Sequence, residues 1–448
     1  MKKFTLTLIA LSVYSYMFAG GILTNSNQSA RFLRMLSRDA STAVDAVYYN
    51  PAGLMMLDNG FYLSLSNQTI FQTKTIQNDF PFLNEKKYTG DVTVPAFPAF
   101  YSVYKMDKLA ISFGLSPNAG GGTAKYNRGL PSFETQIAML PAMITGMGIP
   151  TTNYTVDINF DGSSIFWGGQ LGASYKFTDN IAAFAGARYI YAVNTYNGHI
   201  NDIMINPTHP LINPTGGFMS APAFFTAAGD AAHAAATANK EVDVKQTGTG
   251  ITPILGVNLN FDKLNIGIKY EFKTKLELEN ETTTDETGMF PDGAITKTDI
   301  PAILSVGVAY SITEDFKASV GIHHYFDKNA DWDGREKFID NNFYELSCGL
   351  EYNVSEKVLV SAGYLHTQTG VGQGYQTDMS HSLSSNTVGF GGEFKVSEKL
   401  TLNAGMSYGV YVTDDKMIDY SSLGLTSYKE TYDKTSTSFA IGIEYKLF

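Results

Sequence analysis

The chain has 448 residues and a net charge of −11, and its composition excludes several classes of protein. The negative charge excludes a nucleic-acid-binding protein that depends on a positive field of its own. The single cysteine, Cys348, excludes an internal disulfide framework and a cluster of thiolate metal ligands. Charged residues make up 17% of the chain and aromatic residues 13%, with 42 glycines. This balance indicates β-structure in surroundings less polar than water.

The first twenty residues have the pattern of a secretory signal peptide. Lys2 and Lys3 precede an apolar stretch over residues 4–18, and Ala19 and Gly20 follow it. A basic start, a short apolar stretch and a small-residue exit are typical of a leader that is removed on export. We therefore expect residues 1–19 to be cleaved, with an uncleaved membrane anchor as the alternative. No later stretch of 18 apolar residues is present, so no transmembrane helix is predicted.

Beyond residue 58 the chain alternates between apolar and polar residues in many segments. Near the C-terminus, Phe439 and Ile441 share one face of a strand, whereas Gly442 and Glu444 share the other. By the same parity, Phe448 is predicted on the polar face. The segments that fit this period of two are residues 60–76, 91–106, 108–118, 163–177, 180–197, 241–261, 263–280, 297–312, 315–327, 341–354, 357–368, 381–396, 399–412 and 434–448. Their number, fourteen, is even, so both ends of the strand series lie on one side.

Six short turns separate the predicted strands in pairs, and longer loops separate the pairs. The turns are Met106-Asp107-Lys108, Thr178-Asp179-Asn180, Asp262-Lys263, Thr313-Glu314-Asp315, Ser355-Glu356-Lys357 and Ser397-Glu398-Lys399. Aromatic residues such as Tyr175, Phe261 and Tyr352 come just before several of them. Short turns on one side, long loops on the other and an aromatic girdle are typical of a bacterial outer-membrane barrel. We therefore predict an all-β chain, a 14-stranded antiparallel transmembrane β-barrel over residues 59–448.

Residues 20–58 precede the first strand and lack its alternation. Residues 28–38 can form a short helix, and the turn chemistry of Asn50-Pro51-Ala52-Gly53 follows it. A segment of this length is too short to fold as a domain of its own. A barrel of 14 strands is wider than one that side chains fill, so the segment can close the lumen. The alternative is a loose periplasmic leader.

The run from Asp39 through Asp45 to Asn50-Pro51-Ala52-Gly53, placed just before the first strand, resembles the hatch motif of the FadL/TodX family. Members of that family are outer-membrane transporters of long-chain fatty acids and hydrophobic aromatic compounds. The resemblance implies a lumen closed by an N-terminal hatch over residues 20–58, with Asp45, Asn50, Pro51, Ala52 and Gly53 as its motif. It also implies passive diffusion through a side opening at a kinked third strand, where Gly114, Ser116 and Pro117 are the residues expected to form the kink.

Two predicted loops, residues 119–162 and 198–240, are far longer than the others and contain apolar segments. Apolar side chains in an extracellular loop are unfavourable in water unless they cover another apolar surface or a ligand. Methionine-rich surfaces can adapt their shape to many apolar ligands. We predict that the two loops form a hydrophobic capture groove, with a lid that binds no ligand as the alternative. The predicted ligand-binding residues are Ile137, Met139, Leu140, Met143, Ile144, Met147, Phe224 and Phe225.

An anionic head group on a ligand would require a cation inside the lumen. Arg188 and Lys269 fall on the polar faces of their strands, so they are the predicted head-group residues. Luminal glutamates such as Glu271 offer the alternative, because they can pair with these cations in purely structural ion pairs.

The sequence shows no metal-ligand spacing, no phosphate-binding loop and no nucleophile elbow. We therefore expect neither an enzyme nor a cofactor. The predicted function is passive uptake of hydrophobic small molecules across the outer membrane of a Gram-negative bacterium. The expected partners are that ligand, outer-membrane lipids with lipopolysaccharide and the barrel assembly machinery, around a monomeric chain. A general diffusion porin and a surface receptor or adhesin, for example for haem, are the alternatives.

Overall fold

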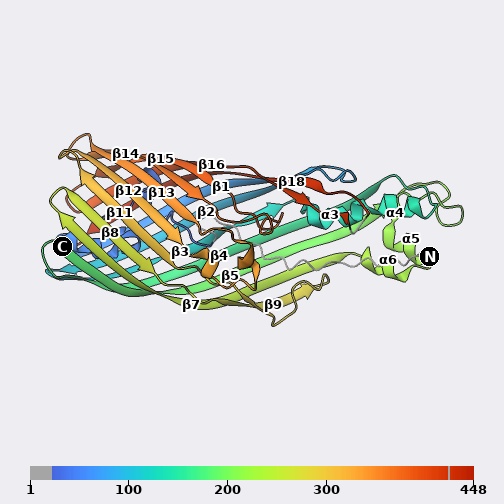
Figure 1. The fold of residues 1–448 in the computed structure, drawn as a ribbon, viewed down its shortest axis with the longest axis horizontal. Coiled ribbons are helices and arrows are strands. Elements are labelled where there is room, and N and C mark those ends of the chain that lie inside the picture. The colour runs from blue at the N-terminus through green and yellow to red at the C-terminus, as the bar shows by residue number, and fades with distance from the viewer. Residues whose placement is uncertain (1–22, 422–423) are drawn as a thin grey trace.

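The strands form one antiparallel sheet that closes on itself to make a barrel (Figure 1). The computed structural model describes residues 23–421 and 424–448, so the predicted signal peptide lies outside the described residues. Closure is made by β1 and β18, which pair without interruption from Tyr62 with Lys446 to Asn78 with Glu430. The strands are β1 (Gly60–Asn78), β2 (Lys87–Met106), β3 (Leu109–Tyr126), β4 (Tyr154–Lys176), β5 (Ile181–Ile205), β6 (Met219–Ser220), β7 (Lys240–Phe261), β8 (Leu264–Glu271), β9 (Glu277–Asp285), β10 (Ile295–Lys297), β11 (Ile303–Ser311), β12 (Phe316–Tyr325), β13 (Tyr344–Asn353), β14 (Val358–Gln368), β15 (Ser385–Lys395), β16 (Leu400–Tyr411), β17 (Asp414–Ile418) and β18 (Tyr428–Lys446).

These 18 strand segments of the described chain make 14 barrel strands. Three barrel strands are each divided in two, because β8 with β9, β10 with β11, and β16 with β17 follow one another along the same neighbours. The two-residue β6 pairs only with the end of β5 and belongs to a loop. The predicted 14-stranded antiparallel barrel is confirmed, and each predicted short turn joins two paired strands.

The predicted strand ends are wrong at the long-loop end of the barrel, which by its loops is the extracellular end. β3 continues to Tyr126, β4 begins at Tyr154 and β5 continues to Ile205. The segments outside the barrel strands are therefore 127–153 and 206–239, both shorter than the predicted loops 119–162 and 198–240. Beyond the membrane the strands no longer need an apolar face, although their backbones remain hydrogen-bonded to each other. The alternation of apolar and polar residues therefore ends earlier in the sequence than the strand pairing does.

The outside of the barrel is apolar and uncovered. Ile441 is 70% exposed, Phe177 61% and Leu171 60%, whereas inward-facing Ser64, Gln68 and neighbouring polar side chains are buried. An exterior of this kind is stable only in hydrocarbon, since water-soluble proteins do not expose so large an apolar belt. Among the described helices, none combines the length and the hydropathy that a membrane-crossing helix requires.

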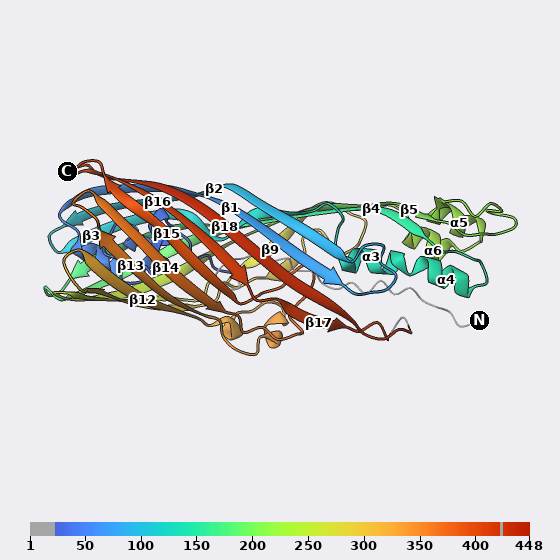
Figure 2. The same ribbon diagram turned by 90° about the horizontal axis from the view of Figure 1, so that it is seen from above.

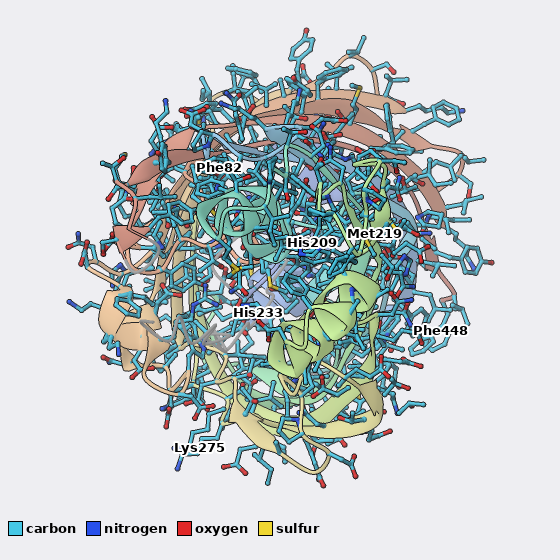
Figure 3. The ribbon with its side chains drawn as sticks, turned by 90° about the vertical axis from the view of Figure 1, so that its right-hand side faces the viewer. Phe82, His209, Met219, His233, Lys275 and Phe448 are labelled. Carbon is cyan, nitrogen blue, oxygen red and sulfur yellow. The ribbon has the colours of Figure 1, made fainter. Side chains whose placement is uncertain are left out.

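The C-terminal residue departs from its predicted place. Phe448 is 66% exposed and stacks on Phe61 at 6.5 Å between ring centroids, beside Tyr104 at 6.4 Å. It lies outside the ring of strands (Figure 3). The parity argument fails because β18 ends at Lys446, and the last two residues no longer alternate.

Short helices lie at the extracellular end, where β4, β5 and β7 project beyond the rest of the barrel (Figure 1 and Figure 2). They are α3 (Pro131–Ala138), α4 (Leu140–Gly146), α5 (Ala221–Ala227) and α6 (Ala231–Ala236). Two 3-10 turns, η2 (Asp327–Asn329) and η3 (Arg335–Phe338), lie in the loop between β12 and β13.

The segment ahead of the barrel lies inside it. Here the hatch means residues 23–59, which contain α1 (Ala30–Met35), α2 (Ala46–Tyr49) and the 3-10 turn η1 (Pro51–Met56). Ser29 caps α1, because its side-chain oxygen accepts a hydrogen bond from the Phe32 backbone at 3.0 Å. The predicted helix over residues 28–38 is too long at its C-terminal end, where Leu36 adopts a left-handed conformation with φ of 60° and ends α1.

A band of glycines on the inner wall allows the hatch to approach the barrel backbone. This glycine girdle comprises Gly267, Gly307, Gly321, Gly349, Gly363, Gly389 and Gly405, on neighbouring strands from β8 to β16. A Cβ added at Gly349 would lie 2.6 Å from the Met35 carbonyl oxygen, and one at Gly405 would lie 2.8 Å from the Arg34 amide nitrogen. Any larger residue at these positions would displace the hatch, so the girdle fixes where it sits.

A charge introduced on the outer surface of the barrel should lower the free energy of unfolding more the deeper it lies in the membrane. We expect Ile441→Arg to lower the free energy of unfolding in lipid vesicles by about 2–4 kcal/mol, because Ile441 lies in the middle of the apolar belt. Gln77→Arg, at an exposed position next to the extracellular end of β1, should lower the free energy of unfolding by only about 0–1 kcal/mol. Denaturant titrations of both variants measure this, and equal costs would contradict the assigned membrane position.

Candidate functional site: a closed lumen and a gap in the wall

Asp45 of the predicted hatch motif organises the hatch itself. Its carboxylate accepts hydrogen bonds from the Arg38 guanidinium at 2.8 and 2.9 Å and from the Ser41 hydroxyl at 2.7 Å. Ser29, the residue that caps α1, also donates to it at 3.2 Å. All four side chains are buried. The carboxylate therefore joins the beginning of α1, the loop after it and the beginning of α2.

The second part of the motif attaches the hatch to the barrel. Asn50 donates to Ser41 of the hatch at 3.0 Å and to Asn258 of β7 at 2.7 Å. The Pro51 carbonyl accepts from Ser174 of β4 at 2.6 Å. A Cβ on Gly53 would lie 2.5 Å from the Ser41 carbonyl oxygen, so this close turn requires glycine. Ala52 is buried in a small apolar cluster with side chains of β5 and β7.

Three arginines, two of them on α1, form ion pairs with glutamates of the barrel wall. Arg31 contacts Glu393 at 2.6 Å and Glu444 at 2.5 Å, and Arg34 contacts Glu351 at 3.0 Å and Glu393 at 3.4 Å. Arg38 lies 3.9 Å from Glu351, to which Lys317 is bound at 2.6 Å. The glutamates are nine-tenths buried or nearly so. Removing one partner of such a cluster leaves a buried charge uncompensated.

A second group of polar contacts holds the loop after α1. Asp39 of the hatch accepts from His323 of β12 at 2.6 Å. The other ring nitrogen of His323 lies 2.8 Å from Glu345 of β13, which also accepts from the Tyr325 hydroxyl at 2.8 Å. The hatch is thereby tied to the wall on both sides of α1, and the pore expected of an empty barrel of this width is blocked.

Arg188 and Lys269, the predicted head-group residues, both face the hatch. Each forms an ion pair with Glu271, Arg188 at 2.5 Å and Lys269 at 2.6 Å. Lys269 also donates to the Tyr48 carbonyl at 2.7 Å, and both cations lie over the Tyr48 ring at 4.9 and 4.5 Å from its centroid. The structure therefore places both cations in a buried contact with the hatch. Their pairing with Glu271 agrees with the alternative that they form structural ion pairs. Their contact with a ligand stays a prediction.

The barrel wall has a gap between β2 and β3. The two strands pair from Met106 with Leu109 up to Phe100 with Leu115, and again at Val92 with Ala124 and Asp91 with Lys125. Between these points residues 93–99 of β2 have no partner on β3. Pro95 and Pro98 lie in this stretch, and proline removes a donor from the ladder. The gap therefore lies in the wall of the barrel and not along the barrel axis.

The edge of β3 at the gap is shaped by bulges and supported by the hatch. The pairing of β3 with β4 shifts between Pro117 and Ala119 and again between Gly120 and Gly122. Asn25 of the hatch donates to the Asn118 carbonyl at 2.9 Å and to the Gly120 carbonyl at 2.7 Å. The hatch therefore replaces hydrogen bonds that β2 would supply in an unbroken sheet.

The predicted kink residues lie at the start of this gap. Gly114 is still within the regular ladder, opposite Tyr101, whereas Ser116 and Pro117 come after the last β2 partner. Sequence reasoning missed the glycines 120–122, of which Gly120 and Gly121 have φ of 65° and 124°. The run of three glycines was the available signal, because residues with side chains rarely adopt these angles.

A narrow cavity of about 50 Å³ lies directly behind the gap. Residues of β1, β2, β3, β18 and the hatch line it, including Asn25, Gln72, Phe97, Gly121 and Ser436. A space of this size holds little more than one or two water molecules. Passage of a larger molecule therefore requires the side chains around the gap to move.

Above the hatch, the extracellular half of the barrel contains a cluster of packed, buried apolar side chains, here called the apolar cluster. Its members come from β1, β2 and β18, such as Ile76, Tyr88 and Tyr432, and from α3, α4 and α5. Of the predicted ligand-binding residues, Ile137, Leu140, Ile144, Phe224 and Phe225 are buried in this cluster, and Met139 and Met143 pack against it. Met147 lies apart and is 55% exposed. Figure 3 looks onto this end and shows α3 and the α5–α6 pair, with His233, within the ring of strands.

Buried polar contacts hold α3 against the apolar cluster. Glu134 accepts from the Tyr88 hydroxyl at 2.7 Å and from the Tyr154 hydroxyl at 2.6 Å. Asp378, in the loop between β14 and β15, accepts from the Ser132 backbone at 2.7 Å at the beginning of α3. Burial raises the pKa of Asp378 above its ordinary value. These contacts connect α3 to three separate parts of the barrel rim.

Comparison with known proteins shows which solved structures share this architecture. No family model matches the sequence, and no curated protein matches it. Solved structures do match. A FadL homologue from Pseudomonas aeruginosa aligns with a TM-score of 0.67 at 13% identity, over 96% of this chain and 100% of that one. The chain has the FadL/TodX fold.

Two other solved structures agree with this fold. The Pseudomonas putida toluene transporter TodX aligns with a TM-score of 0.57 at 15% identity, over 90% of this chain and 94% of its own. The Ralstonia pickettii toluene transporter TbuX gives 0.54 at 14% identity, over 91% and 94%. The FadL/TodX fold therefore covers the barrel and the hatch together, although few residues are identical.

The ion pairs of α1 should be essential for keeping the hatch in this FadL/TodX barrel. We expect Arg34→Ala to lower the free energy of unfolding in detergent by about 3–5 kcal/mol, because Glu351 and Glu393 lose a buried partner. Amide hydrogen exchange in residues 23–59 should become faster. Lys245→Ala, which removes an exposed ion pair with Glu281, should change neither measurement appreciably. Equal effects of the two substitutions would show that the α1 ion pairs do not anchor the hatch.

Proposed function

We propose that this chain is an outer-membrane channel that takes up hydrophobic small molecules by passive diffusion. The observation that carries the proposal is the combination of a lumen closed by the hatch and a wall opened between β2 and β3. A molecule that enters from outside meets a blocked axial route. The remaining exit leads sideways into hydrocarbon, which only an apolar or amphipathic molecule can enter.

The apolar cluster supplies the capture step of this route. It joins the helices α3, α4 and α5 to residues Val92, Val94 and Phe97, which border the gap. A ligand bound among these side chains is therefore already beside the exit. No bond is made or broken and no energy source is required, because the ligand moves down its concentration gradient. The chain acts as a channel and not as an enzyme.

The names of the similar structures support uptake of hydrophobic molecules. The names of TodX and TbuX describe toluene transporters, and the P. aeruginosa chain is described as a FadL homologue. The buried hatch argues against a general diffusion porin, which needs an open lumen. We further propose that the chain acts as a monomer in lipopolysaccharide-containing outer membranes of Gram-negative bacteria, after insertion by the barrel assembly machinery.

Closing the gap should stop uptake. A Cβ at Gly122 would lie 2.7 Å from Val94 Cγ2, so cysteines at these two positions are close enough for a disulfide. In a Cys348→Ser background, we expect Val94→Cys with Gly122→Cys to lose most uptake of labelled fatty acid or toluene when oxidised. Reduction should restore it, because the disulfide closes the gap.

The matched control joins the same two strands where their ladder is intact. Tyr104 and Ile111 lie directly opposite each other, so Tyr104→Cys with Ile111→Cys should transport equally well when oxidised and reduced. Normal uptake by the oxidised gap variant would show that the ligand takes another route.

The two methionines that pack against the apolar cluster should contribute to capture, and the exposed Met147 should not. We expect Met139→Ser with Met143→Ser to weaken binding of an apolar fluorescent probe by roughly tenfold, because apolar contact area is lost. Met147→Ser, on the exposed end of the same segment, is the control and should leave the probe affinity nearly unchanged. Equal loss from both variants would contradict the location of the capture site.

A further inference from the structure

The outer wall of the barrel carries a groove that runs across β14, β15, β16, β18, β1 and β2. Its volume is about 880 Å³, which is within the range of sites that bind small molecules. Figure 2 shows these strands side by side on one face of the barrel. Exposed apolar side chains such as Leu65, Leu402 and Ile443 line it. This surface, here called the outer groove, therefore faces hydrocarbon and not the lumen.

The outer groove follows one row of paired residues between two rows of larger ones. The row runs from each strand to the next in the order Val360, Gly392, Ala404, Ile441, Asn67 and Pro98. Gly392 and Ala404 leave the middle of the row low, because they project little or nothing from the backbone. On β15, the exposed rings of Phe390 and Phe394 lie two residues to either side of Gly392, on the same face. The depression therefore lies across the strands and not along them.

One end of the outer groove lies on the strand that borders the gap. Pro98, the last residue of the row, belongs to residues 93–99 of β2, which have no partner on β3. Asn67, which also lines the groove, accepts a hydrogen bond from the Phe97 backbone at 3.0 Å. An outward-facing side chain of β1 thus holds the unpaired part of β2 in place. The gap and the groove are therefore at the same height in the barrel wall, and β2 connects them.

The direction of the outer groove indicates what it holds. Strands of such barrels tilt by about 35–45° from the barrel axis, so a groove across them is inclined to the membrane normal. Lipid acyl chains point on average along that normal, so each of them covers the groove only in part. Across six strands the groove extends for roughly 24 Å. An elongated apolar molecule that arrives from the gap can lie along its whole length.

We propose that the outer groove binds the alkyl chain of a hydrophobic molecule as it leaves the barrel through the gap. This inference rests on the proposed function and adds a release site on the membrane side of the wall to the capture site among the extracellular helices. Contact with the groove begins while the rest of the molecule is still inside the wall. The apolar surface of the molecule therefore stays covered throughout its passage, which avoids the cost of exposing it to water or to polar backbone.

The test maps where a transported probe lies. Cells that carry the full chain with Cys348→Ser receive, from outside, a long-chain alcohol with a light-activated diazirine group on its alkyl chain. After illumination, mass spectrometry identifies the labelled residues. We expect labelling at Ala404 and Ile441 to exceed labelling at Leu255, which is exposed on β7 at the far side of the ring of strands. The expected ratio is about tenfold, which corresponds to a contact worth about 1.4 kcal/mol.

Two sets of variants separate the release site from general contact with hydrocarbon. Oxidised Val94→Cys with Gly122→Cys should lose the labelling of the groove, because the probe no longer passes the gap. Ala404→Trp should lower labelling at Ile441 to the level of Leu255, because the indole fills the groove. Val388→Trp is the matched control, since it adds the same side chain to the exposed face of β15 outside the groove, and it should leave the labelling unchanged.

Three results would contradict these expectations, and they are distinguishable. Equal labelling of the groove and Leu255 would overturn the release site. Labelling of the groove that survives oxidation of the gap variant would also overturn it, because the groove would then hold hydrocarbon taken from the membrane. In both cases uptake of the probe, measured in the same cells, would leave the channel intact. Uptake no faster than in cells without the chain would overturn the proposed function itself.

Discussion

The fit of the hatch against the inner wall is the constraint on which the rest of this structure depends. The glycine girdle brings the backbone of α1 close to the barrel strands, and the ion pairs of Arg31, Arg34 and Arg38 hold it there. Neither element suffices alone. Without the glycines the segment would not fit, and without the glutamates the cations of Arg31 and Arg34 would be buried unpaired. Together they change a barrel wide enough to be a pore into a closed one.

Closure of the lumen and the gap in the wall depend on each other. A gap leaves backbone groups without partners, which is costly at the depth of the membrane. Asn25 of the hatch supplies hydrogen bonds to the exposed edge of β3, so the segment that blocks the axial route also stabilises the sideways one. Prolines on β2 and glycines on β3 prevent the two edges from pairing again.

The buried cations that face the hatch support it. Arg188 and Lys269 are both paired with Glu271, and both lie over the ring of Tyr48 in α2. This arrangement is stable without a ligand, because a carboxylate of the barrel wall compensates the two charges.

The sequence by itself determined the barrel, its number of strands, the short turns and the presence of a hatch motif before the first strand. These features depend on local chemistry, since alternation and turn residues are legible within a few positions. Only the tertiary structure decided which glycines contact the hatch, where β2 and β3 separate and which cations have partners. Lys74 and Lys434 are 360 positions apart and meet only because β1 and β18 close the barrel. Such contacts follow from register between distant strands, which no local pattern fixes.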